Sequence, residues 1–329
     1  MSLWKYCTKE HSIEFLLSLN LITFDMSDDK KIKCLYSLSN NPMSHYKKFT
    51  IPKHNGKDRT IKAPDPLLKN VQHNLYKNVI SSMEVSKYAT AYKKGSDILK
   101  NSLPHLEQKK ILKLDLEDFF GSITYQMVYK AVFSSLIFPP SVKALLTNIC
   151  CYDDNIPQGA STSAAISNIV MKPFDDYIGK WCKDRNINYT RYCDDMTFSG
   201  DFDEIKLKNK VEGFLKVLGF TINEAKTQLL KGNNRQAVTG IVVNKKAQTD
   251  KAYRKKVRQE LYYCQTFGVE SHLSKINKTD ALSYLQSLLG KVNHILHINP
   301  DDLSFQEAKL LVSHQILELQ VSDGYTMDK

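Results

Sequence analysis

Hydrophobic and polar positions divide the chain into segments with different periods. In residues 1–44 apolar side chains recur at helical spacing, first over residues 13–17 and again over residues 30–38. Residues 45–62 instead alternate around the pair Asn55-Gly56, which is typical of two strands joined by a tight turn. We therefore predict an N-terminal helical segment followed by a β-hairpin.

The middle of the chain mixes strand and helix patterns. The predicted elements are a buried strand at 111–116, helices near 124–136 and 160–180, a hairpin at 188–199 and a helix near 203–218. Gly219 is placed to end the last of these helices as a left-handed cap. From about residue 244 the pattern becomes helical and basic. This order of elements predicts an α+β fold.

Two adjacent acids, Asp194 and Asp195, lie inside the predicted hairpin at 188–199 and are expected at its tip. Two carboxylates about 4 Å apart repel each other by about 4 kcal/mol at the effective dielectric of a protein surface. The pair therefore implies a bound cation, a shifted pKa or a splayed turn. Oxygen ligands favour Mg²⁺ or Mn²⁺. Acidic pairs are also common in solvated turns, and this chain has others at Asp28-Asp29, Asp153-Asp154, Asp175-Asp176 and Asp301-Asp302.

A third carboxylate follows the predicted buried strand. Ile111, Leu112 and Leu114 are apolar, and the strand ends at Asp115. A buried strand that ends in an acid can bring it beside a hairpin that carries two more. Three such carboxylates suit two metal ions about 3.5–4 Å apart, one activating an attacking oxygen and one stabilising a leaving pyrophosphate. The predicted chemistry is phosphoryl transfer.

Three blocks resemble the palm motifs of reverse transcriptases of the group II intron and retron lineage. In chain order they are Leu112-Lys113-Leu114-Asp115-Leu116-Glu117-Asp118-Phe119-Phe120, Pro157-Gln158-Gly159-Ala160 and Arg191-Tyr192-Cys193-Asp194-Asp195. The last is similar to the Tyr-x-Asp-Asp box of the family. Order and spacing agree over roughly the first three quarters of the chain. The second block departs from the usual pattern at Ser161 and Ala164, where prolines are common, but every catalytic carboxylate remains.

Two further elements resemble bacterial retron reverse transcriptases in particular. Asn101-Ser102-Leu103-Pro104-His105 is similar to an Asn-Ala-x-x-His element, with Ser102 in place of Ala. Val238-Thr239-Gly240 matches a Val-Thr-Gly element. A lone histidine is more often structural than catalytic, so no proton-transfer role is assigned to His105.

The resemblance implies a right-hand polymerase with fingers, an antiparallel palm sheet covered by helices, and a helical thumb. We expect an N-terminal helical segment at 1–44, fingers at 45–108, a palm with interleaved fingers elements at 109–243, and an RNA-binding thumb at 244–329.

The same resemblance assigns roles to individual residues. Asp115, Asp194 and Asp195 would be the catalytic acids and would bind two Mg²⁺ ions, with Mn²⁺ as a substitute and the Leu116 carbonyl as a further ligand. Candidate contacts to the deoxynucleoside triphosphate substrate are Lys53, Arg59, Phe120, Gln158 and Lys226.

Four of the five candidate nucleotide contacts have an alternative explanation. Lys53 and Arg59 could be ordinary exposed charges of the hairpin, and Lys226 could be a surface lysine. Phe120 is expected to wall the sugar pocket and exclude a 2′-hydroxyl, or to be a core residue. Gln158 would contact the nucleotide from the opposite side.

Charge is distributed unevenly along the chain. The net charge is +11, and basic segments on both sides flank an acidic centre between residues 114 and 204. This distribution suits a protein that binds phosphate backbones around a metal site. In the predicted thumb, Arg254 and Arg258 share one helical face, and Arg254, Lys255 and Arg258 are the candidate RNA contacts.

The seven cysteines and the N-terminus indicate a cytoplasmic protein. No Cys-x-x-Cys pair occurs, which favours reduced thiols. The apolar stretch at residues 13–17 is too short for a signal peptide or a membrane span.

The sequence therefore predicts an RNA-directed DNA polymerase of a retron. The resemblance implies that it copies part of a structured non-coding RNA of the msr-msd type from a 2′-hydroxyl primer, producing branched single-stranded DNA (msDNA). It also implies a role in anti-phage defence with a separate effector protein, and no membrane partner. The alternatives are a group II intron-like reverse transcriptase without a maturase domain, and a non-catalytic RNA-binding scaffold.

Overall fold

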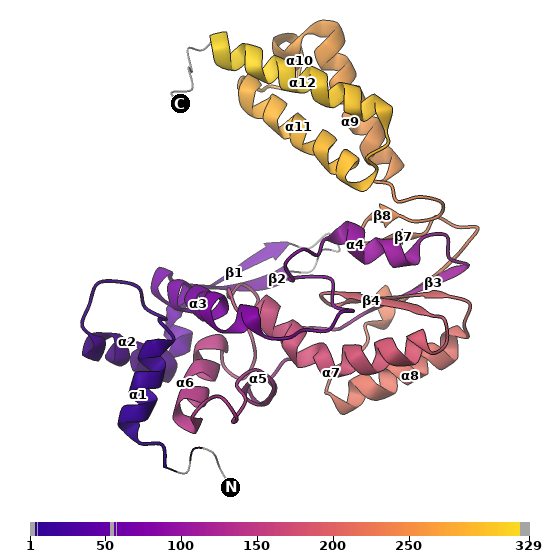
Figure 1. Cartoon of the computed structure of the whole chain (residues 1–329). Coiled ribbons are helices and arrows are strands. Elements are labelled where there is room, and N and C mark those ends of the chain that lie inside the picture. The colour runs from indigo at the N-terminus through magenta and orange to yellow at the C-terminus, as the bar shows by residue number, and fades with distance from the viewer. Residues whose placement is uncertain (1–3, 5, 53–55, 57, 323–329) are drawn as a thin grey trace. The chain divides into compact units, whose positions relative to one another are not determined.

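The computed structural model describes residues 4, 6–52, 56 and 58–322. The chain forms two compact units (Figure 1). One unit comprises Met1–Asp97 and Leu112–Leu229, and the other comprises Ile98–Ile111 and Leu230–Lys329. The boundaries at residues 44, 108 and 243 that the sequence suggested remain predictions.

The first unit opens with the predicted helices and hairpin. Helices α1 (Lys9–Ser18) and α2 (Asp28–Asn40) bury their apolar faces in the main core. Strands β1 (Tyr46–Pro52) and β2 (Asp58–Pro64) then pair antiparallel, which confirms the hairpin. Helix α3 (Pro66–Asn78) follows, with the Asp65 side chain accepting a hydrogen bond from its first turn.

A four-stranded sheet lies in the middle of the chain (Figure 1). Its order is β4-β5-β3-β6, formed by Asn188–Tyr192, Asp195–Gly200, Lys110–Asp115 and Gln228–Lys231. Helix α7 (Ser163–Lys183) packs against β4, and α8 (Glu204–Val217) packs against α7. Gly219 has φ +84°, as expected of a left-handed cap after α8.

The helix predicted at 124–136 is shorter than expected. Helix α5 (Tyr125–Ala131) starts after Thr124, and α6 (Pro140–Cys150) follows as a separate helix that the sequence analysis did not predict. Between the two helices, Phe133 and Phe138 are both buried in the core, where their rings pack edge to face. Single-turn 3₁₀ helices complete the chain: η1 (Pro42–His45), η2 (Ile80–Ser82), η3 (Leu103–His105) and η4 (Glu224–Lys226).

The second unit contains a small hairpin and a group of helices. Strands β7 (Ala237–Val238) and β8 (Ile241–Val242) enclose Thr239 and Gly240, which both have positive φ as a type I′ turn requires. The Asn101 amide on α4 (Ile98–Ser102) donates to the Thr239 hydroxyl at 3.3 Å. The two retron-like elements of the sequence therefore meet in space.

The remaining helices of the second unit pack around a core of their own (Figure 1). They are α9 (Lys251–Phe267), α10 (Val269–Lys275), α11 (Ala281–Ile298) and α12 (Leu303–Ser322). His105 is fully buried in this unit, and burial lowers the pKa of its imidazole to about 3. The neutral, buried ring agrees with a structural role.

Candidate active site

Asp115 lies where a buried strand leaves the core. Strand β3 carries Ile111, Leu112 and Leu114, which are almost completely buried, and it pairs with β5 inside the sheet. The residue Asp115 is only 6% exposed, while its backbone carbonyl accepts a hydrogen bond from the Asn223 amide at 2.8 Å. The strand thus fixes one carboxylate at its exit, as the sequence predicted.

The acidic hairpin differs from the prediction by one residue. Tyr192 pairs with Asp195 across β4 and β5, so the two turn residues are Cys193 and Asp194. Asp195 is the first residue of β5 and not part of the tip, because the antiparallel register takes it into the sheet. Cys193 adopts φ +60°, the left-handed conformation expected at the first position of a tight hairpin turn.

The turn lies beside the end of β3. The Leu116 amide donates to the Asp194 carbonyl at 3.1 Å, which joins the hairpin tip to the strand exit. Burial raises the pKa of the Asp195 carboxyl to about 6; the nearby Lys113 opposes this rise, while the charges of Asp194 and Asp115 add to it. The three predicted catalytic acids are therefore brought together into one crowded cluster.

Lys226 supplies positive charge to this cluster. Its ammonium donates to both oxygens of Asp115, at 2.8 and 2.9 Å. The hydrogen bond to Asp115 is the main cause that raises the pKa of Lys226. The predicted contact of Lys226 with the triphosphate stays a prediction; in the structure its ammonium is held by Asp115.

The donor set of the cluster fits a hard divalent cation. Carboxylate oxygens are the ligands that Mg²⁺ and Mn²⁺ prefer, and an ammonium on both oxygens of Asp115 shows that this position accepts a cation. Within the described residues, no group of three or more His, Cys, Asp or Glu side chains is arranged so that it could hold a metal ion.

A cavity of about 330 Å³ brings two of the nucleotide candidates together. Its lining includes Arg59 from β2 and Gln158 from the second palm-like block. The other residues that line it are Asp58, Thr60, Lys62, Asp118, Gly121, Asn155 and Ile156. The Lys62 amide donates to the Gln158 carbonyl at 2.9 Å, so hairpin and loop are held together. Gly159 has φ +125°, and a Cβ there would lie 2.7 Å from the Lys62 carbonyl oxygen.

The other nucleotide candidates lie elsewhere or are not described. Neither Phe120 nor Lys226 is among the described residues that line this cavity. Phe120 is half-buried against the main core, with its ring centroid 5.4 Å from that of Phe119. Lys53 lies outside the described residues. Lys62 and Asp118 were not singled out from the sequence as substrate contacts.

The candidate RNA contacts lie on α9 of the second unit. Arg254 donates to the Thr249 carbonyl at 2.9 Å. Arg258 lies 3.7 Å from the Asp302 carboxylate, and its guanidinium is 4.8 Å from the centre of the Phe305 ring. Lys255 is exposed. Both arginines therefore have partners within their own unit.

Sequence analysis did not identify the buried ion pair that connects the acidic hairpin to helix α7. Asp175 was grouped with solvated acidic pairs, but it is fully buried within α7, so that grouping is wrong. It forms an ion pair with the fully buried Arg191 of β4. A signal was present, since Asp175 shares the helical spacing of the buried Met171 and Ile178.

Comparison with known proteins identifies the family. Residues 51–279, more than half of the chain, match the family described as reverse transcriptase (RNA-dependent DNA polymerase). The retron Ec83 reverse transcriptase of Escherichia coli is 32% identical over 268 residues, covering 77% of this chain and 84% of that protein. The retron Ec86 reverse transcriptase of E. coli is 31% identical over 223 residues, covering 66% and 69% respectively.

Among solved structures, that of apo telomerase from Candida tropicalis is similar with a TM-score of 0.48 and 13% identity. It covers 83% of this chain and 58% of the telomerase chain. No helix in the described part of the chain combines the length and apolar character needed to cross a bilayer.

The family match confirms the predicted enzyme class, and the helices and strands of the structure confirm the predicted α+β fold. Reverse transcriptases generally use divalent metal ions, and carboxylate oxygens such as those of Asp115, Asp194 and Asp195 are ligands that such ions prefer. The sequence identity to the two E. coli relatives, and the share of each chain that the alignments cover, narrow the family from reverse transcriptases in general to those of retrons. The chain belongs to the retron reverse transcriptases and is an RNA-directed DNA polymerase.

Proposed function

We propose that this chain copies part of a dedicated structured RNA of the msr-msd type, starting from a 2′-hydroxyl of that RNA. The product would be a branched molecule in which single-stranded DNA is joined to RNA. Membership of the retron family supports this proposal. The observation that carries the polymerase part is the joining of Asp115 and the Asp194 turn through the Leu116–Asp194 hydrogen bond.

The three acids have the central role in this proposal. Asp115, Asp194 and Asp195, with the Leu116 carbonyl, would hold Mg²⁺. Bound there, Mg²⁺ would supply charge stabilisation for the attacking hydroxyl and the departing pyrophosphate. Lys226 pairs with the Asp115 carboxylate, and on substrate binding it would exchange this partner for a phosphate oxygen.

The 330 Å³ cavity is the proposed site for the incoming triphosphate. Arg59 can bind phosphate oxygens through two parallel hydrogen bonds, and Lys62 adds a second positive charge. Gln158 would contact the nucleotide from the facing loop. Phe120 would lie under the sugar and exclude a 2′-hydroxyl, so that deoxynucleotides are selected.

The basic residues of α9 are proposed to bind the cognate RNA. Arg254, Lys255 and Arg258 would contact its phosphate backbone. By analogy with its relatives the chain would act in anti-phage defence together with a separate effector protein.

The test is to purify the full-length protein from cells that carry its neighbouring non-coding sequence and to analyse the nucleic acid that co-purifies. We expect single-stranded DNA whose 5′ end remains linked to RNA, and whose mobility rises after ribonuclease treatment. The variant Asp194→Asn should carry RNA but no DNA. DNA with a free 5′ end in the wild type would contradict 2′-hydroxyl priming while leaving reverse transcription intact.

A further inference from the structure

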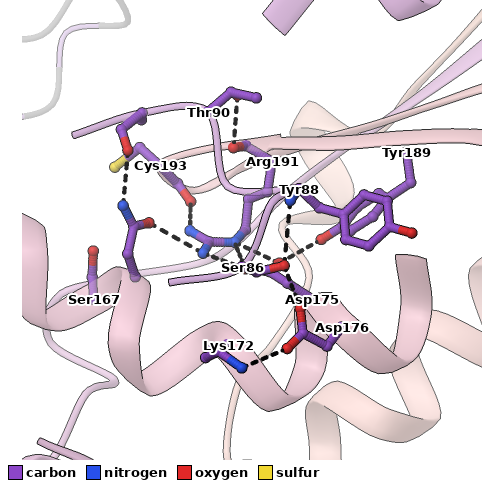
Figure 2. A network of polar contacts seen from close by, with 12 residues as sticks. Ser86, Tyr88, Thr90, Ser167, Lys172, Asp175, Asp176, Tyr189, Arg191 and Cys193 are labelled. Carbon is purple, nitrogen blue, oxygen red and sulfur yellow. Dashed lines mark hydrogen bonds and ion pairs between the residues drawn. The ribbon is translucent and has the colours of Figure 1, made fainter. Parts of the chain in front are cut away.

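Arg191 is a fully buried charge directly behind the catalytic turn. It lies in β4, three residues before Asp194, and is 0% exposed. Its charge partner is Asp175 of α7, which is equally buried. The guanidinium Nε and Nη2 donate to the two carboxylate oxygens at 2.9 and 2.6 Å (Figure 2). Such a two-point contact fixes both the position and the orientation of the guanidinium plane.

The same guanidinium also binds the turn itself. Its Nη1 donates to the Cys193 carbonyl at 2.8 Å, and its Nη2 donates to the Asn168 side-chain oxygen at 3.2 Å. The Cys193 carbonyl belongs to the peptide group that leads into Asp194. One side chain therefore connects helix α7 to the backbone of the turn that carries a catalytic acid (Figure 2).

The backbone of Arg191 is held as well. Its amide donates to the Tyr88 carbonyl at 2.8 Å, and its carbonyl accepts from the Thr90 amide at 2.8 Å. Because side chain and backbone are both fixed, Arg191 cannot shift without breaking several buried hydrogen bonds. The constraint is passed directly to the left-handed residue Cys193, whose φ of +60° is unfavourable for a residue with a side chain.

A need for stability alone does not account for this arrangement. Well-packed apolar residues often stabilise a core as much as a buried ion pair does, since desolvation offsets the attraction. Arginine is distinctive because its planar fork can bind a carboxylate and a backbone carbonyl at the same time. A lysine at this position could reach Asp175 or Cys193, but its single ammonium cannot reproduce the fork.

We propose that Arg191, held by Asp175 and Asn168, is a positioning residue that sets the Asp194 carboxylate in the place required for metal binding. This inference rests on the metal-binding role proposed above for Asp194. Arg191 acts through the Cys193 peptide and touches neither substrate nor metal. Residues that orient metal ligands from behind typically change metal affinity or activity by about 10- to 100-fold when they are replaced.

Tyr189 provides a matched control. Its hydroxyl donates to Asp175 Oδ1 at 2.8 Å, within the same buried group as the bond from Arg191. The hydroxyl bonds to the aspartate and not to the turn. Tyr189→Phe therefore removes one buried hydrogen bond to Asp175 while the ring and the link from Arg191 to Cys193 both remain.

The experiment compares full-length wild type, Arg191→Lys, Tyr189→Phe and Asp194→Asn. Mn²⁺ affinity is measured without nucleotide from the paramagnetic resonance signal of free Mn²⁺. The kcat for deoxynucleotide addition to a generic annealed primer and the Mg²⁺ concentration for half-maximal rate are measured beside it, each corrected for the folded fraction. We expect Arg191→Lys to weaken Mn²⁺ binding and lower kcat by about 10-fold or more. Tyr189→Phe should stay within about twofold of wild type in both measurements.

Equal losses in Arg191→Lys and Tyr189→Phe would overturn the proposal, because the effect would then be general to the buried group. Wild-type Mn²⁺ affinity in Arg191→Lys would overturn it as well. If Arg191→Lys does not fold, Asn168→Ala takes its place, with weaker Mn²⁺ binding expected and unchanged binding contradicting the proposal. Asp194→Asn distinguishes the positioning role of Arg191 from the metal-binding role of Asp194. Normal Mn²⁺ binding and DNA synthesis in that variant would refute the metal-binding role itself.

Discussion

Two of the aspartate–base pairs in the first unit, Asp115–Lys226 and Asp175–Arg191, differ in almost every respect other than their charges. The Asp115–Lys226 pair lies at the strand exit, with the lysine side chain 56% exposed. The Asp175–Arg191 pair is 0% exposed on both sides. An ammonium at an open position can exchange with another cation, whereas a sealed guanidinium cannot. The first pair is therefore suited to chemistry and the second to holding the chemistry in place.

We call Asp115–Lys226 the open pair and Asp175–Arg191 the sealed pair. The largest effect is expected at the open pair. Asp115→Asn should reduce DNA synthesis by orders of magnitude, because one charge is removed from the metal-binding cluster. The free energy of unfolding should stay the same or rise, since the change also relieves repulsion with Asp194 and Asp195. Primer extension and chemical denaturation of the same preparation measure both. A large loss of stability would show that the open pair is also structural and would remove the contrast.

At the sealed pair we expect the main effect of a substitution on the free energy of unfolding. Asp175→Ala leaves the Arg191 charge buried without its partner, so we expect a loss of about 3–5 kcal/mol in the free energy of unfolding. Asp176→Ala is the matched control, because the neighbouring carboxylate is partly exposed and accepts hydrogen bonds from the side chains of Ser86 and Lys172. Its replacement should remove about 1 kcal/mol or less. Urea denaturation of both variants measures the free energy of unfolding. Equal losses of this free energy in Asp175→Ala and Asp176→Ala would contradict the distinction between the buried and the exposed acid.

The same two pairs illustrate which parts of the site could be predicted from the sequence and which could not. Asp115, Asp194 and Asp195 each lie in a short run whose pattern is local, so strand, turn and acid could be predicted together. The position of Asp195 was wrong by one residue, because register depends on pairing between strands. The Asp175–Arg191 contact joins a helix to a strand, and only tertiary packing creates it. The strands β6, β7 and β8 are two to four residues long, which is too short for any period to be detected.

Lys226 provides a test of exchange at the open pair. Lys226→Met keeps most of the side-chain volume and removes the ammonium group that pairs with the Asp115 carboxylate. We expect the free energy of unfolding to change by about 1 kcal/mol or less, since the lysine is more than half exposed. DNA synthesis should fall, with a change in its Mg²⁺ dependence because the cluster becomes more negative. Lys208→Met, which removes an ammonium from the exposed Glu224 in the same region, is the control and should leave that dependence unaltered. An unchanged Mg²⁺ dependence in Lys226→Met would mean that lysine and metal do not compete.

The smallest effect is expected at a weak ion pair with an exposed arginine, on α9 of the second unit. Arg258 lies 3.7 Å from Asp302 with its side chain 52% exposed, so its interaction within the protein is weak and phosphate can replace it. Changing Arg254 and Arg258 together to Gln should weaken binding of the cognate RNA and lower the slope of log affinity against log salt by about 1 to 2. Extension of a generic primer should suffer less, because the carboxylate site is untouched.

The control for this last prediction removes two charges elsewhere. Lys206→Gln with Lys216→Gln takes them from exposed positions on α8 of the first unit, and the salt slope should then remain that of the wild type. Binding titrations at several salt concentrations, beside primer extension, distinguish the outcomes. Equal slopes for the two double variants would show that α9 contributes only to net charge. A loss of primer extension as large as the loss of RNA binding would instead assign these arginines to the common path of template and primer, with no part in choosing the RNA.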